Sequence, residues 1–108
     1  MAHDEEIADR VRALLADEPG LTERRMFGGL GFMLDGHMAV AADSKGGLMV
    51  RHDPADDSPD PLLAPTVMRG GPIRGWSDID PEVALGDDEL ARLVRIGVGY
   101  VRGLPPKG

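Results

Sequence analysis

The chain has 108 residues, a formal net charge of −7 and an isoelectric point near 4.8, and its length fits a single domain. This acidity argues against unaided nucleic-acid binding, because such affinity comes from neutralising backbone phosphates with basic side chains. The absence of cysteine excludes disulfides and thiolate nucleophiles. No apolar run approaches the roughly 20 residues that span a bilayer, and the acidic first residues do not resemble a secretory signal. We therefore expect a cytoplasmic protein without a membrane partner.

A helix is predicted over residues 4–18. Ile7, Val11 and Leu14 recur at helical spacing, and the acidic residues 4–6 suit the positive end of a helix dipole. Pro19-Gly20 ends the helix. A short strand over residues 22–27 follows, and the glycines at 28 and 29 predict a bend or bulge before the next strand.

Asp35-Gly36 stands between two apolar runs and predicts a two-residue hairpin turn, since both residues tolerate positive φ. The turn pairs Leu34 with His37, and regular pairing then continues to Gly31 with Val40. One face of this hairpin carries Leu30, Phe32, Leu34, His37, Ala39 and Ala41. The other face carries Gly31, Met33, Met38, Val40 and Ala42. Because neither face is polar, either helices cover both faces or one face meets a partner.

The second half of the chain predicts further strands over residues 48–51, 66–69 and 76–79. Residues 53–65 contain four prolines and four aspartates, which predicts an exposed connection. A final helix begins near Asp87 and ends before Pro105. Gly97 and Gly99 inside it each cost about 1 kcal/mol, which predicts a close approach to another backbone.

Together these elements predict one domain over residues 1–108, with a core from about residue 4 to residue 104. The expected fold class is α+β in two layers. A mostly antiparallel sheet of about five strands carries an N-terminal and a C-terminal helix packed on it.

The middle of the chain resembles the N-terminal domain of the TfoX/Sxy family, bacterial proteins known as regulators of competence genes. The motif residues are Arg24, Arg25, Met26, Phe27, Gly28, Gly29, Gly31, Asp35, Gly36 and Trp76. The likeness extends over about residues 20–107. It implies a two-layer α+β domain with a role in transcriptional regulation through protein partners. Full-length family members carry a second, C-terminal domain, so the likeness is to the first domain standing alone.

Complete catalytic or cofactor motifs are not found in the sequence. Gly29-Leu30-Gly31 begins like a dinucleotide fingerprint, but Leu34 occupies the third glycine position. The serines have no histidine and acid at a recognisable spacing. His37 and His52 are expected on opposite sheet faces, solvated at strand ends, and unable to share a metal ion. We therefore expect no enzyme, no cofactor and no metal site.

Arg25, Arg51, Arg69 and Arg74, together with Arg24, lie in or beside predicted strands. Guanidinium groups suit carboxylates and phosphates, which would allow a small-anion or metabolite-binding site. The plainer interpretation is that they pair with the aspartates of residues 53–65 or are solvated, since surface ion pairs are common and weak.

Met33, Met38 and Val40 share the second hairpin face. Methionine fills irregular cores and also makes adaptable binding surfaces. From these residues and the resemblance we expect a regulatory or adaptor domain that binds a protein partner or a second copy of itself. The alternative function is the small-anion or metabolite-binding domain.

Overall fold

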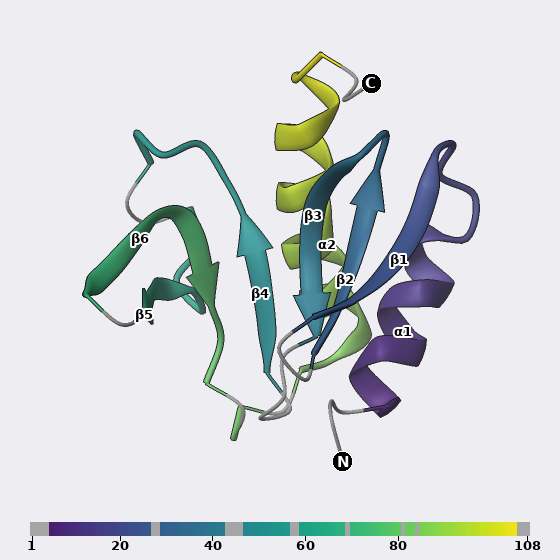
Figure 1. Ribbon diagram of the computed structural model, residues 1–108. Coiled ribbons are helices and arrows are strands. Elements are labelled where there is room, and N and C mark those ends of the chain that lie inside the picture. Colours follow the sequence, from purple (N-terminus) through teal and green to yellow (C-terminus); the bar gives the residue numbers. More distant parts are fainter. Residues whose placement is uncertain are drawn as a thin grey trace.

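The computed structural model describes residues 5–26, 29–42, 47–56, 59–68, 70–80, 82–83 and 85–105. It confirms the α+β fold, with one antiparallel sheet of six strands where about five were expected. The strand order is β1-β2-β3-β4-β6-β5 (Figure 1). The elements are α1 (Glu5–Leu15), β1 (Leu21–Met26), β2 (Gly29–Leu34), β3 (His37–Ala42), β4 (Leu48–Arg51), β5 (Ala64–Met68), β6 (Gly71–Asp78) and α2 (Asp87–Arg102).

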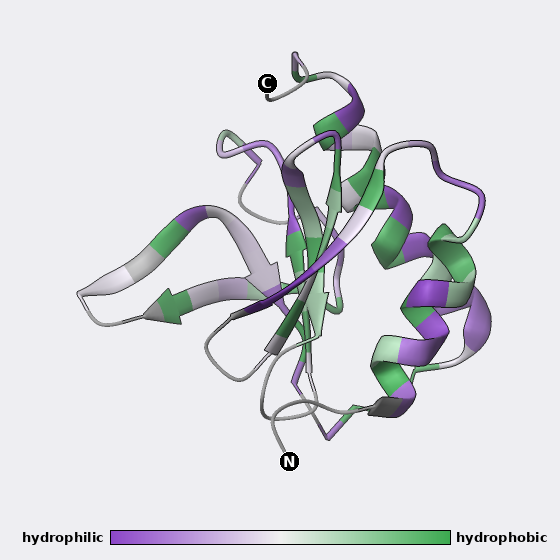
Figure 2. Cartoon of the chain, turned by 45° about the vertical axis from the view of Figure 1, so that its right-hand side comes forward, coloured by the Kyte–Doolittle hydropathy of each residue, from purple (hydrophilic) through white to green (hydrophobic). Residues whose placement is uncertain are grey.

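Both helices pack on the same face of the sheet (Figure 2). α2 contacts β2, β3 and β4, and α1 contacts α2 and β3. The hairpin of β5 and β6 projects on the other side (Figure 2). No helix in the described part of the chain covers the second face of β1–β4. Neither described helix has the length and apolarity needed to cross a membrane.

The core lies between the helices and the sheet. Phe32 at its centre is fully buried among aliphatic side chains from both layers. The other buried members of this cluster are Ala8, Val11, Leu15, Leu30, Val40, Ala42, Leu48, Val50, Leu63, Ile79, Leu85, Leu90, Leu93 and Val94. A smaller cluster of Leu34, Ala39 and Val101 extends it toward the end of α2. The aliphatic core is what the scarcity of aromatic residues requires.

The predicted hairpin turn is confirmed, because Asp35 and Gly36 have φ of 52° and 86°. Leu34 pairs with His37 and Met33 with Met38, as expected. The predicted register beyond that point is wrong. Phe32 pairs with Val40 because a β-bulge adds Ala39 to β3.

The bulge changes which hairpin residues face the helices. Ala39 and Val40 are both fully buried, Ala39 beside Val101 and Val40 in the main cluster. Beyond the bulge Ala42 also joins the main cluster, whereas Ala41 stands opposite Gly31. Val40 and Ala42 are therefore on the helix side, and Ala41 is on the other side, contrary to regular alternation.

Only one of the two glycines inside α2 marks a close backbone approach. A methyl group placed on Gly97 would collide with the carbonyl oxygen of Ala39, and would lie 3.0 Å from Cγ1 of Val40. A methyl group on Gly99 would meet nothing within 4 Å. Gly97 therefore lets α2 settle directly onto the bulge of β3, and Gly99 has no such role.

Arginines of both helices anchor the helix layer to the sheet and its turns. Arg12 of α1 donates two hydrogen bonds to the carboxylate of Glu23 on β1, at 2.6 and 2.9 Å. This contact holds the pKa of Glu23 below its ordinary value. Arg102 of α2 donates to Glu18 at 2.8 Å and to Asp35 in the hairpin turn at 3.1 Å. The hairpin is therefore fixed by charge as well as by packing.

The acidic connection after β4 is less exposed than expected. Asp60 has a side chain only 5% exposed, and accepts hydrogen bonds from Arg92 Nε at 2.6 Å and from the Leu62 amide at 3.0 Å. Leu63 is buried in the core, and β5 begins at the next residue. Pro65 is accommodated because β5 is an edge strand. The second half of the predicted exposed connection therefore holds two buried side chains, Asp60 and Leu63, and its last two residues belong to β5, whereas Pro61, Ala64 and Pro65 are exposed as expected.

Gly97→Ala is predicted to destabilise the fold by about 1–3 kcal/mol, because the new methyl group must push α2 away from β3. Gly99→Ala is the matched control and is predicted to stabilise by roughly 0.5–1 kcal/mol, since it only improves helix propensity. Urea unfolding of the two variants measures both changes. Equal effects from the two substitutions would contradict the packing of α2 on Ala39.

Asp60→Asn is predicted to lower the free energy of unfolding at neutral pH and to lower it by a smaller amount in acid. The hydrogen bond from Arg92 lowers the pKa of Asp60 in the folded protein. Its stabilising effect is therefore present above the unfolded pKa of about 4 and is lost as the pH falls through the lowered folded value. Urea unfolding at pH 7 and near pH 3 tests this, with Asp17→Asn as control, since Asp17 is exposed and forms no ion pair among the described residues. A difference between Asp60→Asn and the parent that is constant with pH would contradict it.

Candidate functional site

The sheet face left uncovered by the helices carries three methionines. Strand register and alternation place a set of five residues there, which we call the methionine face: Gly31, Met33, Met38, Ala41 and Met49. The three methionines are partly exposed, whereas Gly31 and Ala41 between them are buried. The neighbours of these residues along the strands, such as Phe32 and Val50, point into the core.

Met38 lies directly over Gly31. A Cβ atom on Gly31 would stand 2.7 Å from Cε and 3.2 Å from Sδ of Met38. The missing side chain thus provides the space in which the thioether lies against the backbone of β2. Since methionine side chains are flexible and polarisable, this surface can adapt its shape to a contacting molecule.

Val40 does not belong to the methionine face. It is fully buried in the core under the helices, because the bulge at Ala39 shifts the alternation of β3. The prediction that Val40 shares a surface with Met33 and Met38 is therefore wrong. Met49 of β4, one of the clustered methionines expected from the sequence, stands beside Ala41 on this face.

The motif residues shared with the TfoX likeness fall mainly on β1, β2 and the hairpin turn. Arg24 is exposed and pairs with Gly31, on the side away from α1, because its neighbour Glu23 faces Arg12. Gly29 begins β2, and Asp35-Gly36 forms the turn. Phe27, Gly28 and the side chain of Met26 lie outside the described residues. Trp76 lies on β6, far along the sheet from β1.

The arginines proposed to bind an anion are not brought together. Arg25 lies on β1, which β2 and β3 separate from β4. Arg51 on β4 lies over the ring of Tyr100, 5.5 Å from its centroid. Arg74 on β6 makes one long hydrogen bond, 3.5 Å, to the carbonyl of Pro54. Arg69 lies outside the described residues. These arginines therefore form no common site in the part of the chain that is described.

The expected ion pairs of these arginines are also not found. Asp60 pairs with Arg92 of α2 instead, and the side chain of Asp53 accepts the amide of Ala55. Within the described residues, Arg24, Arg25, Arg51 and Arg74 have no carboxylate partner. Arg24, Arg25 and Arg74 are exposed, which fits the other part of the plainer interpretation, that the arginines are solvated. Asp57, one of the expected partners, lies outside the described residues.

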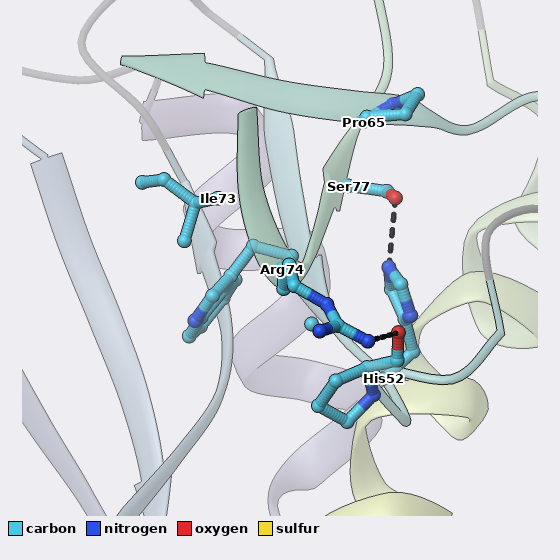
Figure 3. A pocket seen from close by; sticks show the side chains of 8 residues that line it. His52, Pro65, Ile73, Arg74 and Ser77 are labelled. Atoms are coloured by element: carbon cyan, nitrogen blue, oxygen red, sulfur yellow. Dashed lines mark hydrogen bonds between the residues drawn. The ribbon is translucent and has the colours of Figure 1, made fainter. Parts of the chain in front are cut away.

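A hollow of about 260 Å³ opens where β6 bends away from β5 (Figure 3). Its lining comes from the segment that follows β4, from one residue of β5, and from β6. The lining residues are His52, Pro54, Pro65, Ile73, Arg74, Gly75, Trp76 and Ser77. Sequence reasoning named Arg74 and Trp76 but did not join them in one site.

His52 and Ser77 form a buried hydrogen-bonded pair at this hollow. His52 Nε2 lies 2.8 Å from Ser77 Oγ, and Nδ1 lies 3.0 Å from the carbonyl oxygen of Asp53. Because a carbonyl only accepts, Nδ1 carries a proton, and in the neutral ring Nε2 accepts the serine hydroxyl. The two residues are 5% and 1% exposed, so we interpret the pair as a buried polar link between β4 and β6.

This pair could not be found from the sequence. Its members are 25 residues apart and belong to no motif, and only the pairing of β4 with β6 brings them together. The expectation that the histidines are solvated is wrong for His52. His52 is buried, and His37 Nε2 donates to the carbonyl of Pro105 at 2.6 Å. No group of three metal-binding side chains occurs among the residues that the structure describes.

Ser77→Ala is predicted to destabilise the domain by about 1–3 kcal/mol, because His52 Nε2 loses its partner in a buried site. Thr22→Ala, an exposed hydroxyl on β1, is the matched control and should change stability by no more than about 0.5 kcal/mol. Thermal or urea unfolding measures both. A Ser77→Ala variant with the same stability as the parent would argue against a stabilising hydrogen bond between His52 and Ser77.

Comparison with known proteins agrees with the resemblance seen in the sequence. The model of the TfoX N-terminal domain matches residues 13–99, a range that runs from α1 into α2 and includes the methionine face and the hollow. No curated protein and no solved structure matches the chain significantly. Since the family model matches most of its length, the chain belongs to the TfoX N-terminal domain family.

Proposed function

We propose that this domain is a non-enzymatic regulatory module that binds a protein partner through the methionine face. The single observation that carries the proposal is the one-sided cover of the sheet. Both helices pack on one face, and the described residues leave Met33, Met38 and Met49 partly exposed on the other. Apolar surface at the centre of a sheet is the kind of surface that a partner buries.

The chemistry of the surroundings suggests what the partner presents. Arg24 stands at the edge of the methionine face beside Gly31, exposed and without a carboxylate partner in the described chain. A partner with an apolar centre and a carboxylate at its rim would complement both features. Charge at the rim of an interface mainly selects the partner and speeds association, whereas the apolar centre supplies affinity.

The biological role follows from the family. TfoX proteins are known as regulators of competence genes, so we propose that the partner belongs to the machinery of transcriptional control. The net charge of −7 favours contact with a protein over direct contact with nucleic acid. The burial of the Ser77–His52 pair supports a binding module over a hydrolase.

Met38→Lys and Met49→Lys are predicted to abolish capture of a partner, because each replaces an apolar side chain of the methionine face with a charged one. Val67→Lys is the matched control, since Val67 is an apolar side chain on β5 that is 68% exposed and lies outside the methionine face. Affinity capture from a bacterial lysate, with light scattering on each purified variant, makes the comparison. Circular dichroism confirms that all three variants fold.

Three outcomes are distinguishable. A captured protein that is lost with both methionine variants and kept with Val67→Lys supports the proposal. A dimer of the parent that dissociates in the methionine variants assigns the surface to a second copy of this chain. Capture that survives both methionine substitutions, or a monomer that captures nothing, overturns the proposed surface.

A further inference from the structure

The hollow beside β6 arises from a local failure of strand pairing. Pro65 pairs with Ser77 and Val67 pairs with Pro72, so Thr66 alone stands opposite residues 73–76 of β6. Gly75 within this bulge has φ of 85°, a value that side chains rarely adopt. The bulged segment stays attached to the chain after β4, since the His52 amide donates to the Gly75 carbonyl at 2.9 Å. The bulged segment of β6 is therefore held to the chain after β4, and Pro65 of β5 lines the hollow on its other side.

The walls of the hollow are mainly apolar. The side chains of Ile73, Pro54 and Pro65 and the indole of Trp76 line it, and in Figure 3 Ile73 lies across the view from Ser77 and His52. The two buried polar side chains, His52 and Ser77, bond to each other and need no partner from a ligand. Apolar walls of this kind suit a compact apolar group of a ligand.

Arg74 gives the hollow its charge. It is the single lysine, arginine or acidic residue among the eight that line the hollow. Its guanidinium has five donor hydrogens, and the one hydrogen bond it makes in the described structure is the 3.5 Å contact with Pro54. No carboxylate among the lining residues neutralises it. A guanidinium in this state is a ready donor to a carboxylate brought by a ligand.

We propose that the hollow binds a small organic monocarboxylate whose apolar body is about the size of one ring. The apolar body packs against Trp76 and Ile73, and the carboxylate accepts hydrogen bonds from Arg74. The volume of about 260 Å³ lies below the range of about 300–1,000 Å³ typical of drug-sized ligands, which sets the limit of one ring. The site shares no residue with the methionine face and does not depend on the function proposed for that face.

The probe molecules are benzoate and cyclohexanecarboxylate, compared with benzamide and cyclohexanecarboxamide, which have the same shape without the charge. Trp76 is the only tryptophan of the chain, so its fluorescence and its single indole N–H signal in NMR report directly on the hollow. We expect saturable changes with the carboxylates and affinity for the amides at least about tenfold weaker, since one lost charge-assisted hydrogen bond costs about that much.

Arg74→Gln is expected to weaken carboxylate binding by at least about tenfold and to leave amide binding unchanged. Arg25→Gln removes another exposed arginine without a carboxylate partner, far away on β1, and is expected to change neither. Because Arg74 is exposed, its replacement should not affect folding, which the melting curve verifies. Partner capture through the methionine face should be the same for the parent and Arg74→Gln.

The proposal is overturned if neither carboxylate produces a saturable change at Trp76, or if amides bind as well as carboxylates. It is equally overturned if Arg74→Gln and Arg25→Gln have the same effect. None of these three results would bear on the proposal for the methionine face, because that surface is tested by partner capture and not by the signals of Trp76.

Discussion

The contact between α2 and the bulge of β3 is the constraint on which the rest of the structure depends. Ala39 is the extra residue of β3, and it turns both itself and Val40 toward the helices. Gly97 has no side chain, so α2 can lie against the carbonyl of Ala39. This close packing fixes the layer of helices over β2, β3 and β4 and decides which side chains fill the core.

The main consequence of this packing is that both described helices cover the same face of the sheet. Charged side chains of the helix layer find partners there, as Arg12 does with Glu23 and Arg92 with Asp60. On the other face, the described part of β2, β3 and β4 carries the methionine side chains and the short residues between them, with Arg24 of β1 at the edge. The apolar hairpin therefore has one surface sealed by helices and one that is suited to contact with another molecule.

Both proposed sites lie where regular pairing is interrupted. The bulge at Ala39 sorts the hairpin residues between the core and the methionine face, and the longer bulge of β6 opens the hollow around Trp76. Bulges redirect side chains and end local pairing, which is why they often accompany function in sheets. The two irregularities lie on different strands, so partner binding and ligand binding can be separated by substitution.

The sequence by itself determined the two helices, the hairpin turn at Asp35-Gly36, the two-layer fold class and the family, because these depend on local spacing, turn chemistry and a contiguous motif. It did not give the bounds of β5 and β6, which were expected over residues 66–69 and 76–79 and are Ala64–Met68 and Gly71–Asp78. It could not determine which face Val40 occupies, since one inserted residue reverses the alternation. The sequence also could not predict the ion-pair partner of Asp60 or the His52–Ser77 pair, because each contact joins segments that are far apart along the chain. Only the tertiary structure decided these features, since packing and strand pairing select among contacts that local preferences leave equally open.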